Sequence, residues 1–109
     1  MSVLVFERDT QRLSDLSEDL RTAGFRVLGL TRVAELERWP AGEIVVTDWN
    51  SFTPFWKDVG AAAVIVLAET EEQGADACER GATAWLPHAT ATHALIATIV
   101  NAGGVASVN

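Results

Sequence analysis

Three short runs of consecutive apolar residues constrain the fold of this chain more than any other feature. Residues 3–6 read Val-Leu-Val-Phe, residues 44–46 read Ile-Val-Val, and residues 62–68 read Ala-Ala-Val-Ile-Val-Leu-Ala. A strand with one face in water alternates apolar and polar residues, whereas a continuous run is typical of a strand buried on both faces of a parallel sheet. Residues 25–30 and 83–86 provide two further strand candidates. We therefore expect five strands in one parallel sheet.

The segments that connect these strands carry helix signals. Leu13, Leu16 and Leu20 recur at helical spacing, Asp9 can cap the start of that helix, and Gly24 is expected to end it. Four further helices are predicted, over residues 31–39, over one or two turns in residues 54–60, over residues 70–80, and finally up to Gly103 and Gly104. The third of the five helices is thus expected to be short.

Five repeats of a strand followed by a helix place helices on both faces of the sheet. The expected fold is α/β, a (βα)5 three-layer sandwich whose parallel strands run in the order 2-1-3-4-5. A chain of 109 residues fits a single domain, which we expect to cover residues 1–104, with residues 105–109 as a loose tail or the start of a linker. In such sheets the functional crevice lies at the carboxyl ends of the strands.

The charge balance restricts the possible partners. The formal net charge is −7, from 15 acidic and 8 basic residues, so nucleic acids and anionic membranes would be repelled and neither is expected as a partner. The longest apolar run, residues 61–68, is too short to span a bilayer, and the N-terminus lacks the features of a signal peptide. The single cysteine, Cys78, excludes an internal disulfide and is interpreted as a small buried residue. These features together indicate a cytoplasmic protein.

Several enzyme classes lack their sequence signals here. The turn after the first strand reads Glu-Arg-Asp-Thr-Gln, without the glycines that let backbone amides bind the phosphates of a nucleotide or flavin. Cys78, His88 and His93 do not have the spacing of zinc ligands, and no serine or cysteine is paired with a base in the manner of a catalytic triad. A small enzyme or a ligand-binding flavodoxin-like protein is therefore the weakest interpretation.

Acidic side chains follow the first and third predicted strands, which are neighbours in the expected order. Glu7 ends the first strand, Asp48 ends the third, and Asp9 starts the first helix. Carboxylates gathered at such an edge can bind Mg²⁺ through oxygen, or can present one acid as a phosphoryl acceptor. They can equally be ordinary solvated acids at strand ends, and the residues alone leave these alternatives open.

Over residues 3 to about 102 the sequence resembles the receiver domain of bacterial two-component response regulators, a CheY-like domain with a flavodoxin-like fold. Residues 43–48, Glu-Ile-Val-Val-Thr-Asp, resemble the family strand that ends in the phosphoacceptor aspartate, which implies that role for Asp48. Residues 3–9 resemble the first strand with its acidic pair. Residues 81–86 resemble the segment that leads to the fifth strand, with Trp85 at the position of the switch aromatic.

Several positions depart from the family pattern. The acidic pair corresponds to Glu7 and Arg8, so a cation replaces the second acid, which the resemblance implies as a Mg²⁺ ligand. The family hydroxyl after the fourth strand corresponds to Ala68, and the family lysine after the fifth strand corresponds to His88. What the resemblance implies at this edge is a degenerate acidic pocket made of Glu7, Arg8, Asp9 and Asn50 around Asp48.

Arg8 is expected to decide how this pocket works. Phosphoryl transfer depends on cations that neutralise charge on the phosphoryl oxygens, and an arginine would both repel Mg²⁺ and pair with the same carboxylates. We therefore predict an Arg8–Asp48 or Arg8–Glu7 ion pair in place of a metal, and no cofactor. The resemblance then implies an atypical receiver, or pseudo-receiver, that acts in phosphorelay signal transduction by protein–protein contact and is not an enzyme. The alternative is a functional receiver phosphorylated on Asp48, with Glu7 and Asp48 as ligands of Mg²⁺.

The expected partner is a protein, namely a histidine kinase, an output domain or another signalling protein. Its docking surface is predicted on the fourth helix, the fifth strand and the fifth helix, with contributions from Trp85 and the acidic residues 69–72, although plain core packing is an equal alternative for Trp85. Trp39, Trp49 and Trp56 fall in short or irregular segments. Either they cover the core where helices are short, or they mark the contact surface of a homodimer.

Overall fold

The computed structural model describes residues 2–30, 44–50, 63–89 and 92–107. The five predicted strands are present, and the helices predicted over residues 31–39 and 54–60 lie outside the described part of the chain. The strands are β1 (Ser2–Phe6), β2 (Arg26–Leu30), β3 (Ile44–Asp48), β4 (Ala63–Ala68) and β5 (Ala84–Pro87), and the helices are α1 (Thr10–Thr22), α2 (Glu71–Glu79) and α3 (Thr92–Ser107).

The strands form one parallel sheet in the order β2-β1-β3-β4-β5, which confirms the predicted topology. β1 pairs with β2 on one side and with β3 on the other, so the chain reverses its direction of winding between β1 and β3. The carboxyl ends of β1 and β3 therefore form the topological switch point, where α/β sheets place their functional crevice.

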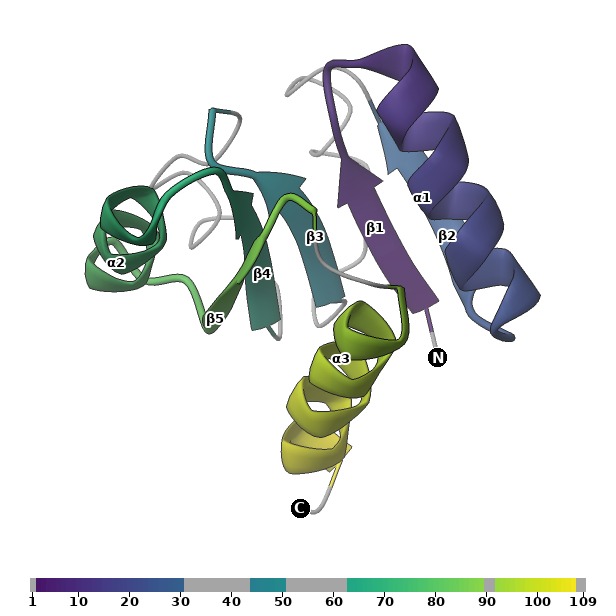
Figure 1. Ribbon diagram of the computed structural model, residues 1–109. Coiled ribbons are helices and arrows are strands. Elements are labelled where there is room, and N and C mark those ends of the chain that lie inside the picture. Colours follow the sequence, from purple (N-terminus) through teal and green to yellow (C-terminus); the bar gives the residue numbers. More distant parts are fainter. Residues whose placement is uncertain (1, 31–43, 51–62, 90–91, 108–109) are drawn as a thin grey trace.

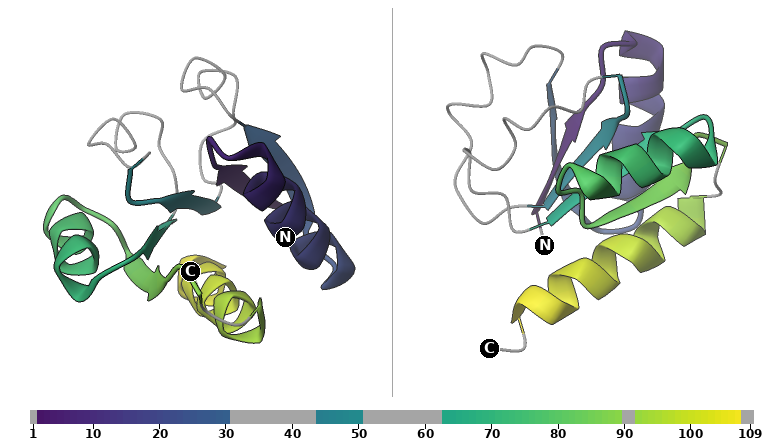
Figure 2. Two further views of the ribbon diagram at one scale, coloured as in Figure 1. Left: turned by 45° about the horizontal axis from the view of Figure 1, so that its top comes forward. Right: turned by 90° about the vertical axis from the view of Figure 1, so that its left-hand side faces the viewer.

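Helices cover the sheet on both faces and complete the predicted three layers (Figure 1). On one face α1 packs on β1 and β2, while α3 packs on β3 and β4 and also contacts α1. On the other face α2 packs on β4 and β5, and the left view of Figure 2 shows it apart from α1 and α3. Among the described elements, one pair of helices thus covers the first face and the short α2 covers part of the second.

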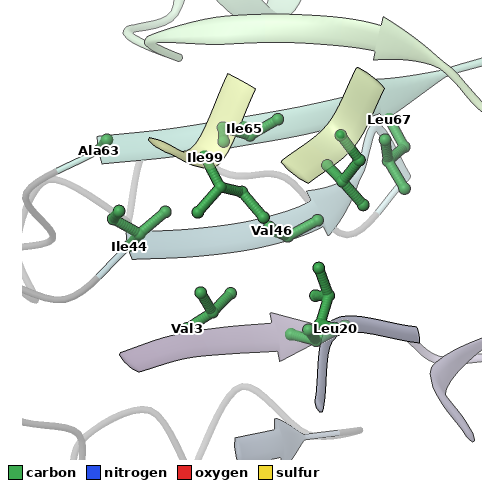
Figure 3. Close-up of a cluster of buried hydrophobic side chains, with 10 residues drawn as sticks. Val3, Leu20, Ile44, Val46, Ala63, Ile65, Leu67 and Ile99 are labelled. Carbon is green, nitrogen blue, oxygen red and sulfur yellow. The ribbon is translucent and has the colours of Figure 1, made fainter. Parts of the chain in front are cut away.

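Alternation along the strands divides the core into two clusters. Val3 and Val5 of β1 face α1 and α3, whereas Leu4 and Phe6 of the same strand belong to the cluster that includes α2. Every residue of β3 and β4 is buried, as the continuous apolar runs predicted. The first cluster consists of Val3, Val5, Leu20, Ile44, Val46, Ala63, Ile65, Leu67, Leu95 and Ile99 (Figure 3), and the second of Leu4, Phe6, Val45, Val64, Val66 and Ala77.

Two helix ends agree with the sequence and one does not. Gly24 and Gly81 have φ of 99° and 114°, in the left-handed region that favours glycine after a helix. The prediction that Gly103 and Gly104 end the last helix is wrong, because α3 continues to Ser107. Glycine inside a helix costs about 1 kcal/mol relative to alanine, which weakens the helix without ending it when the following residues, here Val105 and Ala106, can continue it.

Cys78 on α2 is exposed, so its interpretation as a small buried residue is also wrong. Its neighbour Ala77 occupies the buried position on this helix, at 0% exposure. Residues one apart on a helix point about 100° away from each other, so a nine-residue helix that buries Ala77 and Gly74 turns Cys78 toward solvent.

Candidate functional site

Two buried carboxylates stand side by side at the switch point. Phe6 of β1 pairs with Thr47 of β3, so the next residue on each strand, Glu7 and Asp48, leaves the sheet at the same place. Glu7 is 4% exposed and Asp48 is 5% exposed. Both were predicted to lie at this edge, and neither is an ordinary solvated acid.

The pair is incompletely satisfied. Oε1 of Glu7 accepts a hydrogen bond from the backbone N–H of Asp9 at 3.1 Å, but Oε2 of Glu7 and Oδ1 of Asp48 have no hydrogen-bond partner among the described residues. Burial raises the pKa of Glu7, and the nearby charge of Asp48 adds to the rise, while the hydrogen bond from Asp9 and the charges of Arg12 and His88 oppose it. Protonation of Glu7 is therefore easier than protonation of a glutamate in water.

The cation at this edge is Arg12 and not Arg8. Nη1 of Arg12 lies 4.0 Å from Oε2 of Glu7, whereas Arg8 is exposed and has no ion pair within the described part of the chain. The predicted Arg8–Asp48 or Arg8–Glu7 pair is therefore wrong. Successive side chains of an extended segment point to opposite sides, so the burial of Glu7 turns Arg8 outward, and the first turns of α1 bring Arg12 back over the carboxylate.

Arg12 is anchored by a second group, His88, which follows β5. Nη1 of Arg12 lies 2.8 Å from Nδ1 of His88, and the backbone N–H of His88 donates to the carbonyl of Ala68 at 2.9 Å. A guanidinium has only donors, so in a hydrogen bond between these two groups Nδ1 of His88 is the acceptor. Asp9 contributes from the other end, because its carboxylate caps α1 and accepts from the backbone N–H groups of Gln11 and Arg12.

Comparisons with known proteins agree on one architecture. No protein-family model and no curated protein sequence matches this chain. The receiver domain of the Francisella response regulator 1452 superposes with a TM-score of 0.81 at 15% identity, over 95% of this chain and 97% of that one. An atypical orphan response regulator, described with a new phosphorylation-independent regulatory mechanism, gives a TM-score of 0.71 at 21% identity over 94% of both chains. A Burkholderia pseudomallei response regulator with a phosphorylated aspartic acid and a calcium ion gives 0.74 at 19% identity, over 95% of this chain and 69% of that one.

The chain has the fold of a response-regulator receiver domain. In this receiver fold, Ala68 ends β4 and is fully buried, with a methyl group where the resemblance implies a hydroxyl. His88 lies where the resemblance implies a lysine, and it binds Arg12. Trp85 is half-buried and belongs to the cluster under α2. Its indole lies directly against Gly74, where an added Cβ would overlap the ring.

The residues at the switch point do not fit a divalent cation. Two unpartnered carboxylate oxygens could provide two ligands, but Asp9 is exposed and occupied as a helix cap, and the described residues contain no group of three or more His, Cys, Asp or Glu side chains that could hold a metal. The guanidinium of Arg12 stands 4.0 Å from one of the two free oxygens and repels a second cation there. The chemistry that remains is that of a buried acid pair beside an arginine and an imidazole.

Sequence reasoning missed Arg12, and it also missed a second polar site in the receiver fold. Trp49, Asn50, Asp76 and Arg80 line a hollow of about 240 Å³ between the end of β3 and α2. Asn50, expected in the acidic pocket, lines this second site. The sequence signal for this site was an acidic residue, Asp76, one helical turn before a basic residue, Arg80. No helix within the described ranges is long and apolar enough to cross a membrane.

Proposed function

We propose that this chain is a receiver domain of two-component signalling that acts by contact with other proteins and without Mg²⁺-dependent phosphorylation. The observation that carries the proposal is the position of Arg12, whose guanidinium lies 4.0 Å from Glu7 and 2.8 Å from His88. It supplies a positive charge to the acid pair without a metal. A domain in this condition presents one surface whether or not a phosphodonor is present, and it is a signalling component and not an enzyme.

The partner in this proposal is a protein such as a histidine kinase, an output domain or another signalling protein, in the cytoplasm. Its docking surface is formed by α2, β5 and α3. The acidic side chains Glu69, Glu71 and Glu72 are exposed there, and Trp85 is half-buried beneath α2. The likeness to an orphan regulator with a phosphorylation-independent mechanism supports this proposal. Of the three tryptophans that could mark a homodimer surface, only Trp49 falls in the described residues. Its place against the second cluster favours the alternative role of covering the core.

The second candidate function is a receiver that is phosphorylated on Asp48. It is favoured by the unpartnered Oδ1 of Asp48, which leaves one oxygen of a buried carboxylate available, and by the likeness to a regulator with a phosphorylated aspartic acid. Arg12 and His88 would have to move aside, because both stand at the same edge of the sheet.

Intact-mass measurement after incubation with acetyl phosphate and Mg²⁺ separates the two candidates. We expect the wild-type chain to show no added phosphoryl group. The matched control is Asp48→Asn under the same conditions, which removes the acceptor and keeps the shape of the side chain. A mass gain of one phosphoryl group that disappears in Asp48→Asn would refute the first proposal and establish the second.

A further inference from the structure

The hollow between the end of β3 and α2 is not explained by the acid pair. Its lining residues are Trp49, Asn50, Asp76 and Arg80, and its volume of about 240 Å³ is enough for the end of one long side chain. Trp49 comes directly after Asp48, but its backbone N–H donates to the carbonyl of Leu67 at 2.8 Å and its ring joins the cluster on the α2 face. The hollow therefore lies on a different face from Arg12.

Asp76 holds this site together. Its Oδ2 accepts from Nε1 of Trp49 at 3.2 Å and from Nε of Arg80 at 3.0 Å. The indole is thus fixed with its N–H edge on the carboxylate, and a guanidinium already sits on the same oxygen. The terminal nitrogens of Arg80 form no hydrogen bond with any residue that the structure describes, and the Arg80 side chain is 54% exposed. An exposed ion pair one helical turn apart contributes little to stability, so Arg80 can be displaced at little cost.

The surroundings of the hollow favour a cation. Between residues 69 and 80 the chain carries five carboxylates and one guanidinium. Glu72 and Glu79 lie about one helical turn from Asp76 on the same side of α2, and both are exposed. An anion that approached Arg80 would meet this negative field, whereas a cation would be attracted by it.

We propose that this hollow receives a cationic side chain, arginine or lysine, of a partner protein. The incoming cation takes the place of Arg80 on Asp76 and lies against the indole of Trp49, where the aromatic ring and the carboxylate attract it together. The inference rests on the proposed function, since it gives the chemistry of a protein partner. It involves neither Asp48 nor Arg12, so the phosphodonor experiment and the experiment below can fail independently.

The test is an NMR titration of the full chain that follows the indole N–H signal of Trp49, which is assigned by its loss in Trp49→Phe. The probes are N-acetyl-arginine methylamide and N-acetyl-lysine methylamide, with N-acetyl-glutamate methylamide as the anionic comparison at the same ionic strength. We expect saturable shifts with a cationic probe. Asp76→Asn should weaken binding of the cationic probe about tenfold or more. Arg80→Ala should strengthen this binding a few-fold, because it removes the competing guanidinium. Glu71→Gln should change it by less than about twofold.

Glu71→Gln is the matched control because it removes one carboxylate from the same helix at a position turned away from Asp76. A shift with the glutamate probe that is lost in Arg80→Ala would show an anion site and overturn the proposal. If Glu71→Gln weakens binding of the cationic probes as much as Asp76→Asn does, the probes respond only to the general negative charge of α2. That result would also overturn the proposal. If no probe produces a saturable shift, the proposal is overturned as well.

Discussion

At the scale of single residues, the site depends on which arginine reaches the acid pair. Arg8 is next to Glu7 in the sequence, and that closeness suggested the ion pair, but it leaves the strand on the opposite side. Arg12 is five residues away in sequence and 4.0 Å away in space. The sequence predicted the two acids because strand ends in a parallel sheet converge. It could not show whether Arg8 or Arg12 lies beside these acids, because the orientation of α1 on the sheet decides which arginine reaches them.

Replacement of Arg12 is expected to open the acid pair to divalent cations. In Arg12→Ala the positive charge is gone, and the two unpartnered carboxylate oxygens of Glu7 and Asp48 can act as ligands together with water. We expect saturable Mg²⁺ binding in the low millimolar range for Arg12→Ala, measured by calorimetry, and none for the wild type. Arg8→Ala removes the same charge from the same segment and should behave as the wild type. If Mg²⁺ binding appeared in Arg8→Ala instead, Arg8 and not Arg12 would be the residue that excludes the metal.

Glu7 is expected to reduce stability at neutral pH. Its pKa is raised in the folded chain because burial disfavours the charged form. The folded state therefore holds the proton more tightly than the unfolded state, and the free energy of unfolding falls as pH rises from the ordinary glutamate value through the raised one. Above that window the charge is present and its cost is complete. The free energy of unfolding rises again as pH falls back through this window.

The change that tests this is Glu7→Gln, whose amide oxygen can still accept from the N–H of Asp9. We expect it to raise the free energy of unfolding near neutral pH by about 1–2 kcal/mol, since a buried charge with an unpartnered oxygen is removed. Urea unfolding from about pH 5 to about pH 7.5 should show the gain shrinking toward acid. Glu18→Gln on the exposed side of α1 is the control and should change little. A loss of stability at neutral pH in Glu7→Gln would contradict the account.

At the scale of elements, the strands were the most predictable part of the fold. The apolar runs of β1, β3 and β4 are short but continuous, so burial on both faces could be predicted directly from them. Glycine signals at Gly24 and Gly81 worked because a positive φ follows the helix there. The same residue type failed at Gly103 and Gly104, where no left-handed conformation is required and the helix continues. A glycine allows the backbone to leave the helix, and the tertiary structure around it decides whether the helix ends there.

Gly74 shows a different use of glycine, in the contact between α2 and β5. Its missing side chain makes room for the indole of Trp85, and a Cβ there would overlap that ring. Gly74→Ala should therefore lower the free energy of unfolding by about 2 kcal/mol, even though alanine is the better helix former by about 1 kcal/mol. In a Trp85→Leu background, where the indole is gone, the same change should be neutral or stabilising. Urea unfolding of the four chains in this cycle gives the coupling, and additive effects would show that the ring and the glycine do not interact.

At the scale of the whole molecule, the two faces of the sheet are covered unequally within the described residues. α1 and α3 bury Leu20, Leu95 and Ile99 against the strands, whereas α2 buries only Gly74 and Ala77. Apolar burial stabilises by area, and a fully buried leucine or isoleucine contributes about 1.5–3 kcal/mol where an alanine methyl contributes far less. Among the helices that the structure describes, α2, which forms part of the proposed docking surface, is therefore the one with the least apolar burial.

This asymmetry predicts graded opening of the chain. Native-state hydrogen exchange should show amides of α2 exchanging through local openings at least about 1–2 kcal/mol smaller than the global free energy of unfolding, while β1, β3 and β4 exchange only globally. Ile99→Ala, which removes a buried side chain of the first cluster, should lower protection across the central strands by about 2–4 kcal/mol. Ala77→Gly should lower protection chiefly in α2, by about 1 kcal/mol. Equal protection of α2 and the central strands, or a uniform loss in Ala77→Gly, would mean that the short helix unfolds only with the whole domain, and a partner would then bind a surface that is already fully formed.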